Sequence, residues 1–231
     1  MIAIKKSQSL RQQVYQALRQ IILRGDLNSG ERIVETKLAD RLQVSRTPIR
    51  EAIGQLHREK LIVSNPKGGF KVATLSIEDA VQLYDCRIAL EQLAVAGACE
   101  HITAQQLKQL EKYVELAEQS AASQTKQSDS YQLLEIDYQF HHLVAESSGN
   151  QWLLGLLEQV FAQMALLRVQ TTKHNSNVLE IRLEHRQVYE AIAHKKVDLA
   201  QAKIAEHLTA SKIRVTRELE IINRTKLSTF K

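Results

Sequence analysis

The sequence predicts a mainly α-helical protein: an N-terminal winged helix-turn-helix followed by a C-terminal all-α bundle of six to seven helices. Glycine and proline are scarce, with 8 and 2 copies among 231 residues, which favours helices over a turn-rich β fold. From residue 76 onward, apolar residues recur at helical spacing. Two short strand-like runs lie between residues 61 and 73. We therefore expect two domains, residues 1–75 and residues 76–231.

The charge of the chain is unevenly divided between these two parts. Residues 1–75 contain 14 lysines and arginines against 6 acidic residues, whereas the remainder contains 17 against 20. The formal net charge of the whole chain is +5. A basic N-terminal third joined to a mildly acidic body indicates a nucleic-acid-binding domain attached to a domain with another task.

The sequence predicts neither a membrane anchor nor a secretion signal. No apolar run reaches the length of about 20 residues that a membrane span needs, and the first ten residues are polar. Cys86 and Cys99 fall on one expected helix about 20 Å apart, which is beyond disulfide reach. We expect a cytoplasmic protein with free, partly buried thiols and no membrane partner.

The first domain is expected to begin with a helix over residues 7–24 that ends at Gly25. A short helix over residues 35–42, a tight turn and a helix over residues 45–59 follow, which is the helix-turn-helix order. Apolar runs at 61–63 and 70–73 flank a segment with proline and glycine. This pattern predicts a β-hairpin, the wing.

The third helix of this domain carries its basic groups at its start. Ser45 is expected to cap the helix through its hydroxyl, and Pro48 is tolerated in the first turn. Arg46, Thr47 and Arg50 lie in the first turns, where positive charge does not favour the helix. Such a helix is suited to a DNA major groove. The alternative is a solvated amphipathic helix with ordinary surface arginines.

The turn of the expected hairpin contains Lys67, Gly68 and Gly69. Two glycines and a basic side chain allow the backbone to approach phosphates or the minor groove closely. A plain surface turn is the alternative interpretation of this segment.

The second domain is expected to contain helices only. Their capping residues include Ser76, Thr103 and Asn150. The expected helices cover residues 76–100, 103–122, 131–147, 150–170, 176–194 and 197–223, followed by a frayed tail.

This body also contains a set of candidate metal ligands. Asp137 and His141 are four residues apart and project from one helical face. His185 and His207 lie on two other expected helices. One carboxylate and three imidazoles suit a divalent ion such as zinc or nickel. On spacing alone, hydrogen-bonded or surface histidines are the alternative, and we assign that role to His57, His101, His142, His174 and His194.

Four runs in the first domain resemble a known family: Arg32–Glu35, Leu38–Leu42, Val44–Ala52 and Asn65–Phe70. Together they are similar, over about residues 8–74, to the N-terminal domain of GntR-family bacterial transcription regulators. The resemblance implies operator recognition by Arg46, Thr47 and Arg50, assisted by the wing at Gly68 and Gly69. Some members also use an arginine early in the second helix. Thr36 stands at about that place here, so this contact is not carried over.

The body, about residues 77–222, resembles the all-helical ligand-binding FCD domain of the FadR branch of that family. The resemblance lies in Arg87–Glu91, Asp137–His141, Ser148–Asn150, Glu184–Arg186 and His207. It implies that the aspartate and three histidines hold a metal, which helps to bind a small carboxylate beside Arg87. All four ligand positions are filled, which favours the metal-containing members over the acyl-CoA-binding one. Arg87 has a simpler alternative, a surface ion pair with Glu91, and Arg168 is a second candidate for the ligand cavity.

The sequence therefore predicts a homodimeric transcription regulator, not an enzyme, that binds a near-palindromic double-stranded DNA operator and responds to a small organic acid. A helical metal-dependent hydrolase with a DNA-binding head is one alternative. The sequence contains no His-Glu-x-x-His motif, nucleophile signature or phosphate-binding glycine loop that would support this alternative. A constitutive DNA-binding protein whose body only dimerises is the other.

Overall fold

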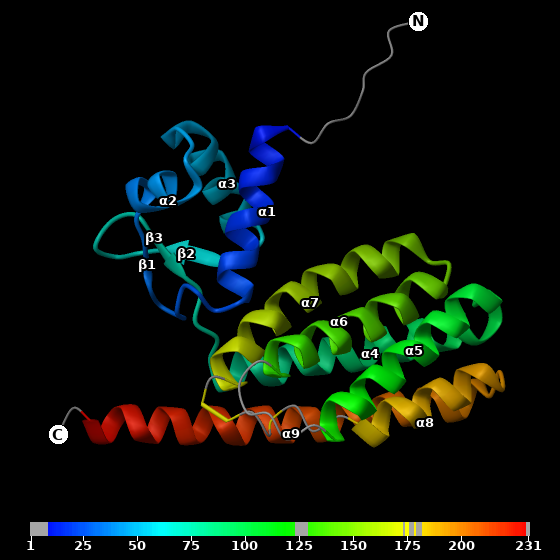
Figure 1. Cartoon of the computed structure of the whole chain (residues 1–231). Helices are drawn as coiled ribbons and strands as arrows, with labels where there is room; N and C mark the ends of the chain where they lie inside the picture. The colour runs from blue at the N-terminus through cyan, green and yellow to red at the C-terminus, as the bar shows by residue number, and fades with distance from the viewer. Residues whose placement is uncertain (1–8, 123–128, 173, 176–177, 179–181, 230–231) are drawn as a thin grey trace, which may run out of the picture. The chain divides into compact units, whose positions relative to one another are not determined.

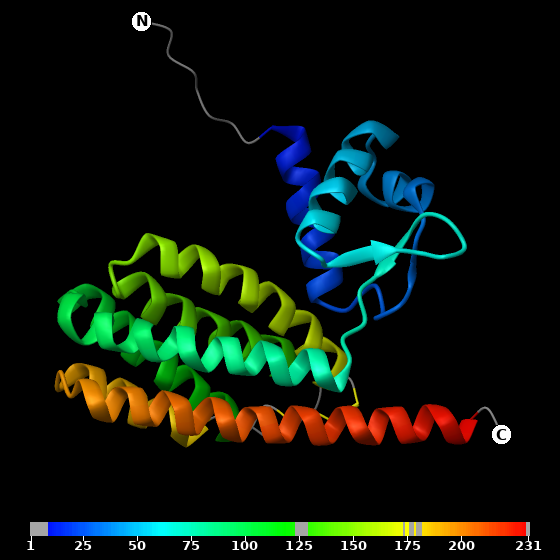
Figure 2. The same ribbon diagram turned by 180° about the vertical axis from the view of Figure 1, so that it is seen from behind.

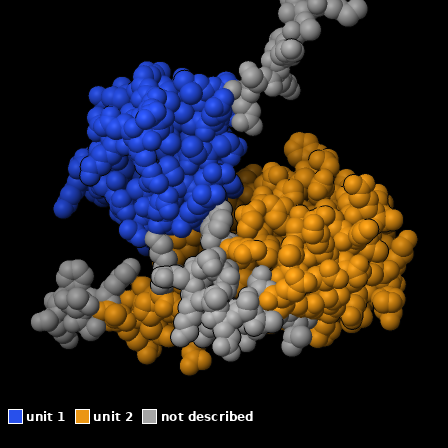
Figure 3. Space-filling view, in the orientation of Figure 1, with its two compact units in different colours: residues 1–74 blue, residues 75–231 orange. Residues whose placement is uncertain are grey.

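The computed structural model describes residues 9–122, 129–172, 174–175, 178 and 182–229. The chain divides into two compact units, residues 1–74 and residues 75–231, which Figure 3 shows in blue and orange. Over the described residues it forms nine helices and three strands of two or three residues each. The predicted mainly α fold is confirmed.

The first unit is built on three helices, α1 (Leu10–Leu23), α2 (Glu35–Leu42) and α3 (Arg46–Arg58) (Figure 1). The side chain of Ser9 caps α1 by accepting a hydrogen bond from the Gln12 amide, while the expected start at residue 7 lies outside the described residues. Gln43 ends α2 in a left-handed conformation with φ 52°. The apolar faces of the three helices form the core of this unit with Val14, Leu18, Ile22, Leu38, Ile49, Ile53 and Leu56.

The wing is a three-stranded antiparallel sheet with strand order β1-β3-β2. The expected hairpin is present as β2 (Ile62–Ser64) and β3 (Phe70–Val72), with Ile62 opposite Val72. The other edge of β3 pairs with β1 (Arg32–Ile33). A strand of two residues is too short to show the alternation by which strands are recognised, so β1 was not predicted.

In its described residues the second unit is a bundle of six helices. In both ribbon views the last helix, α9, lies alongside α4 (Figures 1 and 2). Their bounds are α4 (Ile77–His101), α5 (Ala104–Ala122), α6 (Asp129–Ser147), α7 (Gln151–Thr172), α8 (Arg182–Ala193) and α9 (Val197–Thr229).

Three of the expected helix caps are present in this bundle. Ser76 and Asp79 form a capping box at the start of α4. The Asp79 amide donates to the Ser76 hydroxyl oxygen, and the Ser76 amide donates to the Asp79 carboxylate. Thr103 and Gln106 form the same exchange before α5. Asn150 accepts a hydrogen bond from the Leu153 amide and so begins α7. Each satisfies backbone N–H groups that the helix itself leaves without partners.

Other local expectations need correction. Ser45 occupies the N-cap position of α3, but its side chain makes no capping hydrogen bond. The last helix does not fray after residue 223, because α9 continues to Thr229. Of the two free cysteines, Cys99 is buried whereas Cys86 is exposed.

The helices of the bundle enclose a continuous apolar core that includes Phe140, Leu157, Phe161 and Ile204. Helix α7 is long and apolar enough to cross a membrane by length and composition, contrary to the expectation that no run qualifies. Half of that stretch is buried inside the bundle, which is typical of a helix in the core of a helical bundle. The core surrounds a small group of buried polar side chains, which forms the candidate site.

Candidate metal centre and nucleic-acid interface

The first turns of α3 place their polar side chains in solvent and their apolar side chains in the core. Arg46, Thr47 and Arg50 are exposed, while Ile49 between them is fully buried. The buried side chain fixes the rotation of the helix, so the three polar groups occupy one outer face. The structure therefore brings the three predicted DNA-reading side chains together.

A carboxylate that the sequence analysis did not assign lies beside these arginines. Glu35, at the start of α2, accepts hydrogen bonds from Arg50 Nε at 2.8 Å and from a terminal nitrogen of Arg46 at 3.2 Å. The hydrogen bond from Arg50 chiefly lowers the pKa of Glu35, and the one from Arg46 adds to it. Glu35 therefore pairs with both guanidinium groups.

The tip of the wing is exposed and tightly turned. Asn65 accepts from the Gly68 amide and donates to the Gly69 carbonyl, both at 2.8 Å. Gly68 and Gly69 have φ of 88° and 78°, values that side chains with a Cβ rarely adopt. Lys67 is exposed on the same turn. The two glycines make the turn possible, and the lysine gives it a positive charge.

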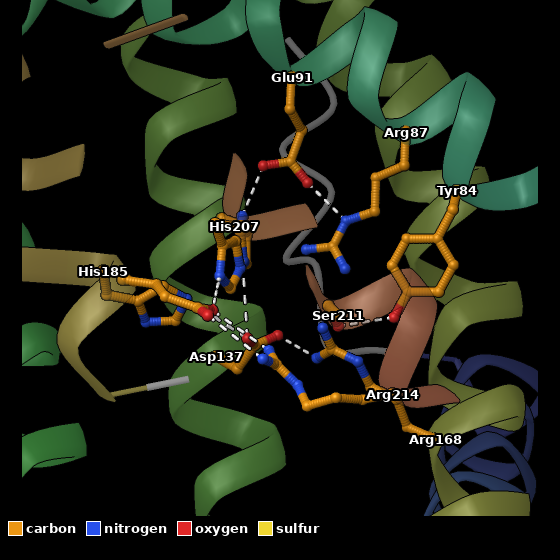
Figure 4. A network of polar contacts seen from close by, with 11 residues as sticks. Tyr84, Arg87, Glu91, Asp137, Arg168, His185, His207, Ser211 and Arg214 are labelled. Carbon is orange, nitrogen blue, oxygen red and sulfur yellow. Dashed lines mark hydrogen bonds and ion pairs between the residues drawn. The ribbon is translucent and has the colours of Figure 1, made fainter. Parts of the chain in front are cut away.

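The second unit brings the four candidate metal ligands into one buried cluster (Figure 4). Asp137 and His141 come from α6, His185 from the first turn of α8 and His207 from α9. One potential ligand atom from each lies within 4.8 Å of every other, and each residue is at most 1% exposed. Three helices thus converge on one point, as predicted.

Three distances within this cluster are close to those expected around a shared cation. Two ligands that are each about 2.1 Å from an ion lie about 3.0 to 3.4 Å apart for octahedral to tetrahedral angles. Asp137 Oδ1 is 3.5 Å from His141 Nε2 and 3.4 Å from His185 Nε2. His207 Nε2 is 3.2 Å from His141 Nε2.

Two outer carboxylates lie at hydrogen-bonding distance from the Nδ1 atoms of two of the imidazoles. Glu91 Oε2 lies 2.5 Å from His141 Nδ1, and Glu184 Oε2 lies 2.7 Å from His207 Nδ1. A carboxylate accepts from Nδ1–H, which leaves the lone pair of Nε2 facing the centre of the cluster. The two Nε2 atoms lie 3.2 Å apart, and a cation between them would bind the lone pair of each.

At neutral pH the cluster keeps Asp137 charged and His185 and His207 neutral. Burial raises the pKa of Asp137, but Arg168 and His141 outweigh it and hold that pKa well below its usual value. Burial lowers the pKa of His207 to about 3, although the hydrogen bond with Glu184 opposes the change. Burial likewise lowers the pKa of His185. Ionised carboxylate and neutral imidazole are the forms that bind metals.

Several buried polar atoms of this cluster lack a partner among the described residues. They include Asp137 Oδ1 and both ring nitrogens of His185. Buried polar groups are normally paired, because an unpaired one costs about 1–3 kcal/mol. A cation bound at Asp137 Oδ1 and His185 Nε2 would satisfy two of these atoms, so the donor set fits a divalent metal.

Further buried polar residues adjoin the four candidate ligands. Arg87 on α4 donates from Nε to Glu91 Oε1 at 2.5 Å, and these side chains are 1% and 0% exposed. The pairing with Glu91 is therefore real, but it is buried rather than on the helix surface. Arg168 on α7 is buried as well and donates to Asp137 Oδ2.

Sequence reasoning missed the outer residues of this network. From the sequence, Glu91 was expected only as a surface ion-pair partner of Arg87. Glu184 was noted only as the residue before the candidate ligand His185. No local pattern marks the residues on α4 and α9, which are Tyr84, Ser211 and Arg214.

Comparison with known proteins agrees with this division of the chain. Residues 10–72 match the family described as bacterial regulatory proteins, gntR family, and residues 82–210 match the FCD domain. The uncharacterized HTH-type transcriptional regulator YdhC of Bacillus subtilis (strain 168) is 32% identical over 195 residues, which covers 84% of this chain and 86% of YdhC.

The chain belongs to the GntR family and carries an FCD domain. The HTH-type transcriptional repressor RspR of Escherichia coli (strain K12) is 27% identical over 205 residues, which covers 89% of this chain and 88% of RspR. The solved structure of E. coli McbR/YncC has a TM-score of 0.77 at 24% identity and covers 88% of this chain and 95% of that one, which shows the shared fold.

These relatives are named as transcriptional regulators and not as enzymes. The GntR-family chain is accordingly a transcriptional regulator, and the predictions of its family and of its non-enzymatic class are confirmed. FCD domains typically bind metal, and this one contains a buried cluster of histidines and an aspartate.

Proposed function

We propose that this GntR-family regulator is a cytoplasmic homodimer whose affinity for a DNA operator is set by a small organic acid bound at a metal site. Residues 1–75 would form the DNA-binding domain and residues 76–231 the domain for metal, effector and dimerisation. The observation that carries the proposal is the buried convergence of one carboxylate and three imidazoles in the second unit.

Operator recognition is assigned to the outer face of α3 and to the wing. Arg46, Thr47 and Arg50 would contact base edges in the major groove, since arginine reads guanine through two hydrogen bonds. Lys67 and the adjacent glycine turn would contact the backbone or the minor groove. A homodimer would set two such helices on half-sites about 34–36 Å apart on a near-palindromic double-stranded operator.

The metal is assigned to Asp137, His141, His185 and His207, with zinc or nickel as the ion. When bound, the ion supplies a Lewis-acidic positive charge that attracts a carboxylate. Glu91 and Glu184 hold two of the histidines in the tautomer that leaves Nε2 available. A solved structure titled the metal-free FCD domain of TM0439 shares the fold, with a TM-score of 0.53 at 19% identity.

Arg87 is assigned to the effector carboxylate. One terminal nitrogen of its guanidinium is buried without a hydrogen-bond partner among the described residues. A planar guanidinium binds a carboxylate through paired hydrogen bonds. An acid bound there would act on operator affinity to the extent that it prefers one of two arrangements of the dimer.

A thermal-shift screen of small organic acids, run with and without EDTA, tests the effector site. An acid at about 100 times its Kd adds about 2.7 kcal/mol, which is about 5–10 °C in a unit of this size. We expect the stabilisation to vanish with EDTA. Stabilisation that persists in EDTA would contradict the metal-dependent site, and no stabilisation by any acid would favour a constitutive DNA-binding protein.

Selection of tight-binding duplexes from genomic fragments, followed by anisotropy titration, tests the DNA face. We expect Arg46→Ala and Arg50→Ala each to weaken operator binding by about 1–3 kcal/mol. Arg58→Ala is the matched control, because Arg58 is exposed in the last turn of the same helix. Unchanged affinity in both test variants would remove the assignment of α3.

A further inference from the structure

Two basic side chains lie directly opposite each other on the sheet of the first unit. In the antiparallel pairing of β1 with β3, Arg32 stands opposite Lys71. Residues paired in this way project from the same face of a sheet, with their Cβ atoms about 4.5–5.5 Å apart. Arg32 is exposed and Lys71 half-buried, whereas the other face of the sheet packs into the core through Val72. The outer face of this sheet therefore carries two adjacent positive charges.

The side chains of Arg32 and Lys71 make no hydrogen bond or ion pair with any residue that the structure describes. Five of the six acidic residues in this unit have partners elsewhere. These contacts join Asp26 to Arg41, Glu31 to Asn28, Glu35 to Arg46 and Arg50, Glu51 to Arg11, and Glu59 to Tyr15. Like charges directly opposite each other destabilise a sheet, so an anion bound against this pair would remove an unfavourable interaction.

The pair adjoins both parts of the unit that are assigned to DNA. Arg32 comes three residues before Glu35, which contacts the two reading arginines of α3, so no more than about 11 Å of chain separates them. Lys71 comes four residues after Lys67 at the wing tip, no more than about 14 Å along the chain. Since β1 and β3 are neighbouring strands, the two charges connect the reading helix with the wing tip.

The structure of duplex DNA suggests what such a position contacts. A sugar–phosphate backbone separates each major groove from the adjacent minor groove. A protein with a helix in the major groove and a wing tip in the next minor groove therefore crosses that backbone, and the side chains between the two elements face its phosphates. Contacts to phosphate fix the register and orientation of a protein without reading the sequence. Two adjacent cations without a protein partner are suited to this role.

We propose that Arg32 and Lys71 form a phosphate-binding site for the DNA backbone between the major groove read by α3 and the minor groove at the wing. This inference rests on the proposed DNA-binding role of the first unit and adds two contacts to it. The guanidinium of Arg32 presents paired donors to phosphate oxygens, while Lys71 contributes a point charge. Bound phosphates screen the repulsion between the two side chains, and their counterions are released into solution.

Anisotropy titration of the full-length protein over a range of salt concentrations tests the proposal. The probes are the duplex selected from genomic fragments and a random-sequence duplex of the same length. Each phosphate contact that is lost makes the slope of log affinity against log salt shallower by about 0.9. We expect Arg32→Gln and Lys71→Gln each to weaken binding of both duplexes about five- to ten-fold at about 0.1 M salt. The double variant should lose about 1.8 in slope.

Two further variants separate a DNA contact from a loss of charge or of folding. Arg58→Gln is the matched control, because Arg58 is exposed in the last turn of α3 and the change removes the same charge. It should keep the wild-type slope and an affinity within about two-fold. Lys71→Glu places an opposite charge across from Arg32, which favours the sheet. Its midpoint of thermal unfolding should equal or exceed that of the wild type, while its affinity for both duplexes falls further than in Lys71→Gln.

The outcomes separate this inference from the proposed function. Unchanged salt slopes in Arg32→Gln and Lys71→Gln, with operator binding weakened in Arg46→Ala, would overturn the phosphate site and leave recognition by α3 intact. Weaker binding of the selected duplex alone would indicate contacts to bases and would also overturn it. A lower unfolding midpoint in Lys71→Glu would contradict the repulsion between the two side chains on which the inference depends. If the wild-type protein binds neither duplex, both the inference and the proposed function fail.

Discussion

Replacing Arg87 with methionine should destabilise the helical unit far more than a helix-surface ion pair can explain. Its guanidinium and the Glu91 carboxylate lie 2.5 Å apart and are 1% and 0% exposed. Removing one partner of a buried pair typically costs about 3–5 kcal/mol, because the other charge is left buried. Glu91 also contacts His141, and this contact still stabilises the buried carboxylate when Arg87 is replaced. We therefore expect the free energy of unfolding to fall by about 3 kcal/mol, near the lower end of that range.

Urea and thermal unfolding, followed by circular dichroism in EDTA, measure this loss. At about 2–4 °C per kcal/mol for a unit of this size, the midpoint should fall by about 6–12 °C. Lys203→Met is the matched control, because Lys203 forms an exposed pair with Glu206 on α9 at 2.7 Å. That variant should lose less than about 0.5 kcal/mol.

A loss in Arg87→Met no larger than in Lys203→Met would refute the buried arrangement and restore the surface-pair interpretation. If Arg87→Met does not fold, a variant with methionine at both Arg87 and Glu91 provides the test. Replacing both members of a buried pair with apolar groups is much less harmful than removing one. The double variant should therefore fold, and its failure to recover stability would also contradict the reasoning.

Three other outcomes are expected. Glu184→Gln should weaken metal binding about 10–100-fold, whereas Glu190→Gln on the same helix should not; equal affinities would contradict an orienting role. Glu35→Gln should narrow the ratio of operator to non-specific DNA affinity at fixed salt, and an unchanged ratio would mean that Glu35 does not orient the reading arginines. Glu118→Gln should be less stable than the wild type by at most about 1 kcal/mol at neutral pH. The hydrogen bond from Arg186 chiefly lowers the pKa of Glu118, so this contribution is present above about pH 4.5 and disappears as the pH falls through the lowered pKa; a difference that persists in acid would indicate another cause.

Local features of the chain were accessible from sequence because each depends on a few neighbouring residues. The spacing of Asp137 and His141 places both on one helical face wherever the helix packs. The same holds for the caps at Ser76 and Asn150, whose partners lie three residues away. The glycine turn of the wing also carries its own signal.

The rest of the site depends on packing between helices that are distant in the chain. Glu91 contacts His141 across 50 positions, and Arg168 contacts Asp137 across 31. Such pairs appear only when the bundle is assembled, so the sequence showed Glu91 as a neighbour of Arg87 and nothing more. Glu35 was missed for the same reason, since its contacts with α3 depend on how α2 and α3 pack.

X-ray absorption spectroscopy of the zinc-loaded protein, combined with elemental analysis, tests the central claim most directly. The protein should be purified without a chelator and without a metal-binding tag. We expect about one zinc per chain with three imidazole nitrogens at about 2.0–2.1 Å and at least one oxygen ligand. His185→Ala should reduce the number of imidazoles to two. A zinc content near zero, or a bound zinc without imidazole ligands, would contradict a metal centre at Asp137, His141, His185 and His207.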